Sequence, residues 1–277
     1  MKPATLRCDF ERDGLLAGVD VLSRERTAYY AGKYAEFIEK YREHPSYPEW
    51  TYGKTELLLG WVVELASEKA LLDIVEALLG PDILLWNAFL PAKAPRTSGL
   101  FSWHQDATYW PVAPTERIVS AWVALSVVHR SNGAMQMVRG SHRRGPVQHE
   151  MTFDTKSMLR RGQQAQVDAD NPNIVGIDLA PGQASFHHTL TLHCSSPNES
   201  DDWRLGVGLN YAAADVSPLP GHSDSAMLLR GSSGNTGFVL EEPPDFDLSP
   251  LALSRFVDAA LRQKARYADA GGSGSTG

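Results

Sequence analysis

The sequence predicts a mostly β protein with flanking helices, built as a double-stranded β-helix, or jelly roll. Residues 1 to about 80 carry apolar side chains at helical spacing, whereas short β-prone runs separated by turn residues extend from about 83 to 215. A loop and a last helical pattern occupy 216–266. Many short strands flanked by helices are typical of two sheets packed as a jelly roll. We therefore expect a single domain over residues 1–270 and a flexible Gly/Ser-rich tail at 271–277.

The N-terminal part is expected to contain three helices. The first spans about 22–43, carries aromatic residues at helical spacing, and stops before Pro45. The second spans about 55–66. The third spans about 67–79, with Ser67 as its N-cap and Gly80-Pro81 at its end. Apolar stripes of this kind normally mean burial, so these helices should pack on the core.

The predicted strands begin after Pro81. The strongest candidate is 118–128, an almost continuous run of apolar and small residues. Further candidate strands are 83–89, 133–138, 174–179, 185–192 and 205–212. The polar stretch 145–173 and the Pro-, Gly- and Ser-rich stretch 216–247 are predicted loops. Ser249-Pro250 should then begin a helix that runs to about residue 265.

Composition excludes several classes of protein. Of the 277 residues, 43% are hydrophobic and 21% are charged, as in a globular enzyme and unlike a disordered chain. The net charge of −7 offers no electrostatic footprint for nucleic acid. No apolar run approaches the ~20 residues that span a bilayer, and the N-terminus lacks the apolar core of a signal peptide. The sequence thus predicts a cytoplasmic protein without membrane or nucleic-acid partners, and its two distant cysteines predict reduced thiols.

The segment 101–110 carries two residues that can bind a metal, His104 and Asp106. In an extended strand, side chains two residues apart project from the same face, so these two can reach one cation. A distant third histidine would complete the facial triad of a non-heme Fe(II) oxygenase. On their own, the two residues could equally form a hydrogen-bonded pair at the end of a strand.

Candidates for the distal ligand are the remaining histidines, and three of them, His187, His188 and His193, lie on the strand after Pro181-Gly182. By strand alternation His187 and His193 share a face, while His188 points the other way. Four others lie in polar or loop contexts and are expected to be exposed, namely His44, His129, His149 and His222, while His142 ends the turn 139–142.

The stretch 181–204 resembles the distal half of the phytanoyl-CoA dioxygenase family of Fe(II)/2-oxoglutarate oxygenases. The residues that match the family pattern here are His193, Ser195, Asn198, Ser200 and Arg204. The proximal half matches as well, through Trp103-His-Gln-Asp106, Trp122 and Asn132-Gly133, and the similarity runs from about residue 10 to 215. The sequence departs from the family pattern at Arg139 and Gln183, neither of which is a proposed ligand.

The resemblance implies a set of site residues. His104, Asp106 and His193 would bind Fe(II) on one face, leaving positions for the co-substrates 2-oxoglutarate and O2. Arg204 would bind the far carboxylate of 2-oxoglutarate as a two-pronged cation, Ser195 would add a hydrogen bond, and Trp122 would pack on its carbon chain. Products of the co-substrates would be succinate and CO2.

The carboxylate of Asp106 also bears on the reaction. In the halogenating branch of the family this position is Ala or Gly, which leaves room for chloride. Asp106 therefore favours a hydroxylase over a halogenase.

The substrate is expected to be a small polar metabolite, of the amino acid or organophosphonate type. Candidate pocket residues are Tyr109, Trp110, Arg139, Asn87 and His187. An anionic group on the substrate is suggested by the basic residues of the predicted loops, namely Arg96, Arg139, Arg143 and Arg144. An alternative substrate is an acyl group tethered to coenzyme A or a carrier protein, as for tailoring hydroxylases of natural products. Two other classes stay open, a non-catalytic sensor of metal or 2-oxoglutarate and a zinc hydrolase.

Overall fold

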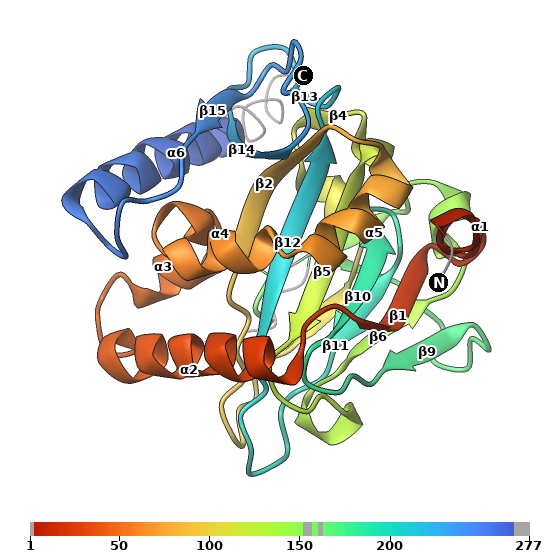
Figure 1. Ribbon diagram of the computed structural model, residues 1–277. Helices are drawn as coiled ribbons and strands as arrows, with labels where there is room; N and C mark the ends of the chain where they lie inside the picture. The colour runs from red at the N-terminus through yellow and green to blue at the C-terminus, as the bar shows by residue number, and fades with distance from the viewer. Residues whose placement is uncertain (1–2, 152–156, 160–162, 269–277) are drawn as a thin grey trace, which may run out of the picture.

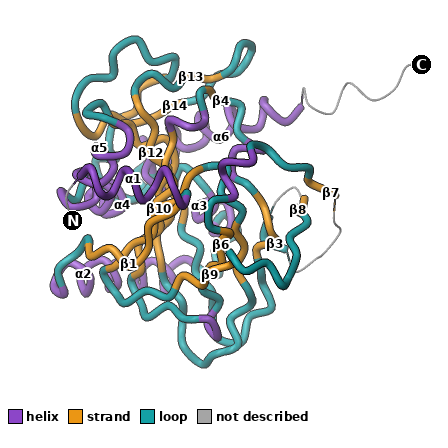
Figure 2. The backbone as a smooth tube through the Cα atoms, turned by 90° about the vertical axis from the view of Figure 1, so that its right-hand side faces the viewer, coloured by secondary structure: helices purple, strands orange, loops and turns teal. Residues whose placement is uncertain are grey.

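A computed structural model describes residues 3–151, 157–159 and 163–268. Two sheets pack face to face, and helices cover the outer face of the larger sheet (Figure 1). Seen from the side, α4 and α5 form one layer, β10 and β12 the next, and β3 and β6 the third (Figure 2). The predicted fold class, mostly β with flanking helices, is confirmed.

The large sheet holds seven strands in the order β1-β10-β5-β12-β2-β14-β15. Their bounds are β1 (Leu15–Asp20), β10 (Gln183–His188), β5 (Ile118–Ala124), β12 (Gly206–Ala213), β2 (Ile83–Phe89), β14 (Ser225–Arg230) and β15 (Val239–Glu241). Neighbours are antiparallel except β14 and β15, which are parallel. Most neighbouring strands in this sheet are therefore far apart in the sequence.

The small sheet has the order β3-β11-β6-β9. Its strands are β3 (Phe101–His104), β11 (His193–Ser195), β6 (Met135–Val138) and β9 (Ile174–Ile177). Two further pairs lie outside these sheets, β4 (Val112–Ala113) with β13 (Ser217–Pro218) and β7 (His149–Met151) with β8 (Gln163–Ala165).

Side chains along β5 alternate between two faces of the large sheet, one covered by the helices and one that faces the small sheet across the interior of the two-sheet sandwich. Val119, Ala121 and Val123 belong to the hydrophobic cluster under the helices, whereas Ser120 and Trp122 point to the other face of the sheet. The strand is buried on both faces, which explains why its sequence is almost continuously apolar.

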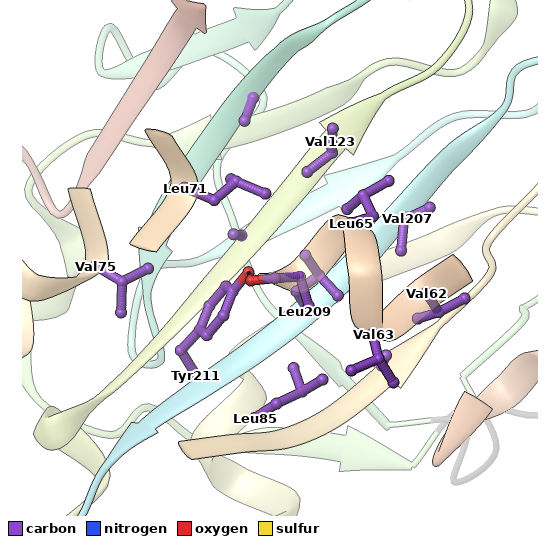
Figure 3. Packing of buried hydrophobic residues seen from close by; sticks show 14 of the residues in the cluster. Val62, Val63, Leu65, Leu71, Val75, Leu85, Val123, Val207, Leu209 and Tyr211 are labelled. Carbon is purple, nitrogen blue, oxygen red and sulfur yellow. Dashed lines mark hydrogen bonds between the residues drawn. The ribbon is translucent and has the colours of Figure 1, made fainter. Parts of the chain in front are cut away.

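Helices close the outer face of the large sheet. Their bounds are α1 (Pro3–Asp13), α2 (Arg24–Tyr41), α3 (Tyr47–Tyr52), α4 (Gly60–Ala66), α5 (Lys69–Leu79) and α6 (Pro250–Ala268). Short 3-10 helices are η1 (Thr55–Leu57), η2 (Asp106–Tyr109), η3 (Thr115–Arg117), η4 (Arg130–Asn132) and η5 (Ser141–Arg144). Figure 3 shows Leu65 and Leu71 of the helices packed over Val123 and Leu209 of the sheet. The hydroxyl of Tyr211 reaches across and donates to the Ala66 carbonyl at 2.9 Å. None of the helices described is long and apolar enough to cross a membrane.

Several predicted boundaries differ from those observed. The predicted helix over 55–66 is divided into η1 and α4. The prediction that Ser67 caps the next helix is wrong, because Ser67 ends α4 and Glu68 precedes α5. The cap of α6 is confirmed, since Ser249 Oγ accepts a hydrogen bond from the Ala252 amide at 3.0 Å.

Three strands of the large sheet lie where none was predicted. β1 falls within the region predicted to be helical, and β14 and β15 fall within the predicted loop 216–247. Each has at most six residues, and β1 contains Gly18 and an irregular register, so the period-2 signal is weak there. The pairing of β1 with β10, of β14 with β2 and of β15 with β14 supplies the stability that local sequence does not indicate.

Candidate metal centre

The structure brings the three predicted ligands together between the sheets. His104 ends β3 and His193 begins β11, and the two residues are paired across these antiparallel strands. Asp106 begins η2, with Oδ1 3.5 Å from His104 Nε2 and 3.6 Å from His193 Nε2. The possible ligand atoms of all three residues lie within 4.8 Å of one another, so the group could hold one metal ion.

Both imidazoles are oriented by the backbone. His104 Nδ1 lies 2.7 Å from the Ser102 carbonyl oxygen, and His193 Nδ1 lies 2.9 Å from that of Thr191. A carbonyl oxygen can only accept, so each Nδ1 carries a hydrogen, and Nε2 is the ring nitrogen that faces the site and could bind a metal. This second contact on each ring is typical of histidines that bind metals.

The electrostatics of the site also fit a divalent cation. Burial, with His104 close by, lowers the pKa of His193 to about 3, so this imidazole is neutral near pH 7. Burial tends to raise the pKa of Asp106, but its electrostatic interaction with His193 and its hydrogen bonds with His104 and His187 hold this pKa well below its usual value. Two imidazoles and one carboxylate form the donor set of non-heme Fe(II) sites.

Gln105 keeps His104 and Asp106 on one side of the chain. Its backbone is extended (φ −116°, ψ 129°), so the expected relation between residues two apart holds although Asp106 starts a 3-10 helix. Its fully buried side chain donates to the Leu190 carbonyl at 2.8 Å and accepts from the Val147 amide at 2.9 Å. Its own amide donates to His149 Nε2 at 3.1 Å, so His149, expected to be exposed, supports this segment.

The prediction that His187 and His193 lie on one strand is wrong. β10 ends at His188, a turn follows, and His193 starts β11 in the other sheet. The two rings still meet, with centroids 4.6 Å apart, because the sheets face each other. His187 Nε2 lies 3.3 Å from Asp106 Oδ2, to which Ser120 Oγ also donates at 2.9 Å.

Arg204 is buried beside Trp122, with 2% of its surface exposed. The guanidinium carbon lies 5.2 Å from the centre of the Trp122 ring. Its Nη1 and Nη2 donate to the carbonyl oxygens of Gly133 and Pro91 at 2.5 and 2.6 Å, and its Nε has no partner among the described residues. Burial lowers the pKa of Arg204 to about 10, which leaves it charged near pH 7.

Lys93 is a second buried basic residue at this place, and it is not among the predicted site residues. Its Nζ donates to Ser195 Oγ at 2.8 Å and contacts the Ser196 carbonyl. Burial and the neighbouring charge of Arg204 lower the pKa of Lys93 to about 6. Neither Arg204 nor Lys93 forms an ion pair with a carboxylate in the described part of the chain, so the two basic groups are suited to an anionic ligand. Lys93 lies in a Pro- and Lys-containing loop, where a lysine is normally read as a surface residue.

The residues predicted for the substrate pocket are only partly brought together. His187 joins Asp106, and Trp110 packs edge-on against Trp86, with centroids 4.8 Å apart. Asn87 accepts a hydrogen bond from the Lys54 amide at 2.8 Å, and Arg139 pairs with Asp13 at 3.3 Å. No described contact joins either of them to the metal-binding group. The side chain of Tyr109 lies outside the described residues.

The basic residues of the loops are largely engaged at the surface. Arg96 forms an ion pair with Asp201 at 2.8 Å, and Arg143 donates to the Arg12 carbonyl at 2.8 Å. Together with the Arg139 ion pair, these contacts weaken the argument that the cluster recognises an anionic substrate, although exposed Arg144 has no such contact within the described ranges.

Comparison with known proteins places these features in a family. The family described as phytanoyl-CoA dioxygenase (PhyH) matches residues 10–206. The human peroxisomal phytanoyl-CoA dioxygenase is 26% identical over 176 residues, covering 59% of this chain and 52% of the relative. A probable alpha-ketoglutarate-dependent hypophosphite dioxygenase of Stutzerimonas stutzeri is 30% identical over 159 residues, covering 57% and 54%. The chain thus spans about half the length of these curated relatives.

A solved structure agrees over nearly the whole chain. The apo form of the non-heme monooxygenase ThoJ is 30% identical and has a TM-score of 0.82, covering 94% of this chain and 96% of its own. The expected oxidoreductase class, with iron and 2-oxoglutarate, fits this family and the His-Asp-His group. The chain belongs to the phytanoyl-CoA dioxygenase (PhyH) family.

Proposed function

We propose that the protein is an Fe(II)- and 2-oxoglutarate-dependent hydroxylase that oxidises an unactivated C–H bond of a small molecule. The observation that carries the proposal is the His104-Asp106-His193 group together with two buried basic residues, Arg204 against Trp122 and Lys93 on Ser195 of β11, the strand that begins with His193. A purely structural metal site would have no use for the two basic residues.

His104, Asp106 and His193 would hold the metal and leave open positions for the co-substrates. When bound, Fe(II) supplies the redox chemistry that couples conversion of 2-oxoglutarate and O2 to succinate and CO2 with oxidation of the substrate. The carbonyl contacts of both histidines fix the donor atoms before binding, so little reorganisation is needed.

Arg204 and Lys93 would bind the far carboxylate of 2-oxoglutarate. Arg204 has a planar guanidinium whose Nε–H has no partner among the described residues and could donate to the carboxylate. Lys93 donates to Ser195 Oγ, and Ser195 is the residue expected to add a hydrogen bond. Trp122 would cover the carbon chain and exclude water, because its ring lies against Arg204. This arrangement supports the roles expected of Arg204, Ser195 and Trp122 and adds Lys93 to them.

The presence of Asp106 supports hydroxylation over halogenation, since its carboxylate occupies the position that chloride would need. For the substrate, the surface ion pairs of Arg96 and Arg139 give less support to an anionic metabolite than the sequence did. The alternative, a tailoring hydroxylase of natural products, draws support from a 1-deoxypentalenic acid 11-beta-hydroxylase of Streptomyces exfoliatus, 25% identical over 145 residues.

The test is formation of succinate from 2-oxoglutarate by the purified protein, with and without Fe(II) and O2, first alone and then with a panel of candidate substrates. We expect His104→Ala and Arg204→Met to abolish turnover, and His188→Ala, a neighbouring histidine on the opposite face of β10, to retain it. Binding of 2-oxoglutarate without any succinate would indicate a sensor. Activity that is indifferent to O2 and 2-oxoglutarate would indicate a hydrolase.

A further inference from the structure

The two oxygens of the Asp106 carboxylate have different surroundings. Oδ1 faces the Nε2 atoms of His104 and His193, at 3.5 and 3.6 Å, and is the oxygen placed to bind a metal. Oδ2 points to the large sheet, where it accepts from Ser120 Oγ at 2.9 Å and lies 3.3 Å from His187 Nε2. The side chain of Asp106 comes from the small-sheet side, so both contacts cross the sandwich.

The register of the large sheet places these two donors side by side. His187 on β10 pairs directly with Ser120 on β5, and the side chains of such a pair lie about 5 Å apart on the same face. Both residues are buried, at 5% and 3% exposure. β1 continues the row, since Leu15 pairs with His187 on the other side and shields it.

The chemistry of His187 follows from its partner. An ionised carboxylate oxygen can only accept, so Nε2 must carry the hydrogen and donate it. The other nitrogen, Nδ1, has no hydrogen-bond partner among the described residues, so no second hydrogen bond from that part of the chain orients the ring. His187 is therefore oriented by Asp106, and in return it restrains the carboxylate.

We propose that Ser120 and His187 are positioning residues that hold Oδ2 of Asp106, so that the carboxylate binds the metal through Oδ1 alone. The inference rests on the proposed metal site. A carboxylate freed from these donors can rotate and chelate with both oxygens, which would take up a coordination position that the co-substrate needs. Loss of such outer contacts typically costs ~10–100-fold in metal affinity or activity.

The experiment measures binding of Mn(II) to the full-length protein by calorimetry, and then binding of 2-oxoglutarate to the Mn(II)-loaded protein without O2. We expect Ser120→Ala and His187→Leu each to weaken one or both affinities by about 10-fold or more. His187→Gln keeps an N–H near the position of Nε2 and should restore most of the loss. If His187 served only to fill space, His187→Gln would not restore the affinities, because glutamine lacks the ring.

Two matched controls, Ser185 and His188, lie on β10, the strand of His187. Ser185→Ala removes an inward, buried hydroxyl that has no described partner, and His188→Leu removes the neighbouring imidazole on the opposite face. Both should bind Mn(II) and 2-oxoglutarate as the wild type does. Wild-type affinities in Ser120→Ala and His187→Leu, or equal losses in the controls, would overturn the proposal.

One further variant separates this proposal from the proposed function. His104→Ala should abolish Mn(II) binding whatever the role of His187. If His104→Ala loses the metal while Ser120→Ala and His187→Leu keep it, the metal site stands and the positioning role is wrong. If the wild-type protein binds no Mn(II), the proposed function itself fails.

Discussion

Lys93 is the residue whose protonation state the fold changes most clearly. It is buried next to Arg204, and burial together with that charge lowers its pKa to about 6. Near pH 8 the amine is therefore largely neutral in the free protein. A dianionic co-substrate would favour the charged form and raise the pKa again.

Binding of 2-oxoglutarate is accordingly expected to take up about one proton above pH 6. Because the bound form prefers the protonated amine, the affinity should fall as pH rises above 6, by up to ~10-fold per pH unit. Calorimetry of the Ni(II)-loaded protein in two buffers of different ionisation enthalpy measures the proton uptake. Lys93→Met should bind more weakly and lose the uptake. The same number of protons in Lys93→Met and the wild type would contradict the role of Lys93.

Individual site residues could be predicted from the sequence where their spacing matches that of a known family. His104, Asp106, His193 and Arg204 stand at the spacing of a known family, and the structure brings the first three together. Lys93 and Ser120 carry no such signal, because their neighbours are set by the pairing of strands and by a folded loop. Asn87 shows the opposite case: it is predicted to line the substrate pocket, but its side chain accepts a hydrogen bond from the backbone amide of Lys54.

Among the elements, β12 is adapted to the large side chains around it. Gly206 and Gly208 are two residues apart and therefore lie on the same face of β12. A Cβ on Gly206 would lie 2.1 Å from the Trp122 ring. The ring that covers Arg204 can therefore lie against the strand only where β12 has no side chain.

Replacement of Gly206 by Ala is expected to push Trp122 toward Arg204. We expect a loss of ~1–3 kcal/mol in the free energy of unfolding, as for other overpacked cores, together with weaker binding of 2-oxoglutarate. Urea unfolding and a co-substrate titration measure the two effects. Gly176→Ala on β9, where a Cβ would meet no atom within 4 Å, is the matched control. Equal behaviour of the two variants would show that the close approach of Trp122 is unimportant.

Elements were predicted well where a long periodic pattern exists. The helix at 22–43 and the strand at 118–128 correspond to α2 and β5, although each is shorter than expected. The sequence predicts one strand over 185–192, but only 185–188 belongs to β10, and 189–192 form a turn that leads to β11 in the other sheet. Strand alternation nevertheless placed His187 and His193 together, for a reason unrelated to the actual geometry.

For the whole molecule, the metal site joins the two sheets. His104 and His193 lie on the small sheet, and Asp106 is held by Ser120 and His187 of the large sheet. A bound metal would therefore oppose separation of the sheets as well as serve the reaction.

Thermal unfolding should consequently depend on metal. At a metal concentration of 100 times Kd, binding stabilises the folded state by ~2.7 kcal/mol, so the Tm should rise when Mn(II) is added and return when it is chelated. His104→Ala should show no such shift, while His188→Ala should respond as the wild type does. A metal-dependent Tm that survives in His104→Ala would place the ion elsewhere.

The architecture as a class could be predicted from composition and period, whereas the order of strands could not. Local sequence indicates strands, but the pairing of β1 with β10 and of β2 with β14 depends on packing between distant segments.

That strand order also bears on how the protein is made. Chains dominated by contacts between distant segments fold slowly, because long loops must close before those contacts form. The two donors on Asp106 come from β5 and β10, and β10 is flanked by β1, near the start of the chain. During synthesis the first strand must therefore wait for its neighbour until most of the chain has been made. Iron capture is therefore expected to be a late event, completed after the sheets close.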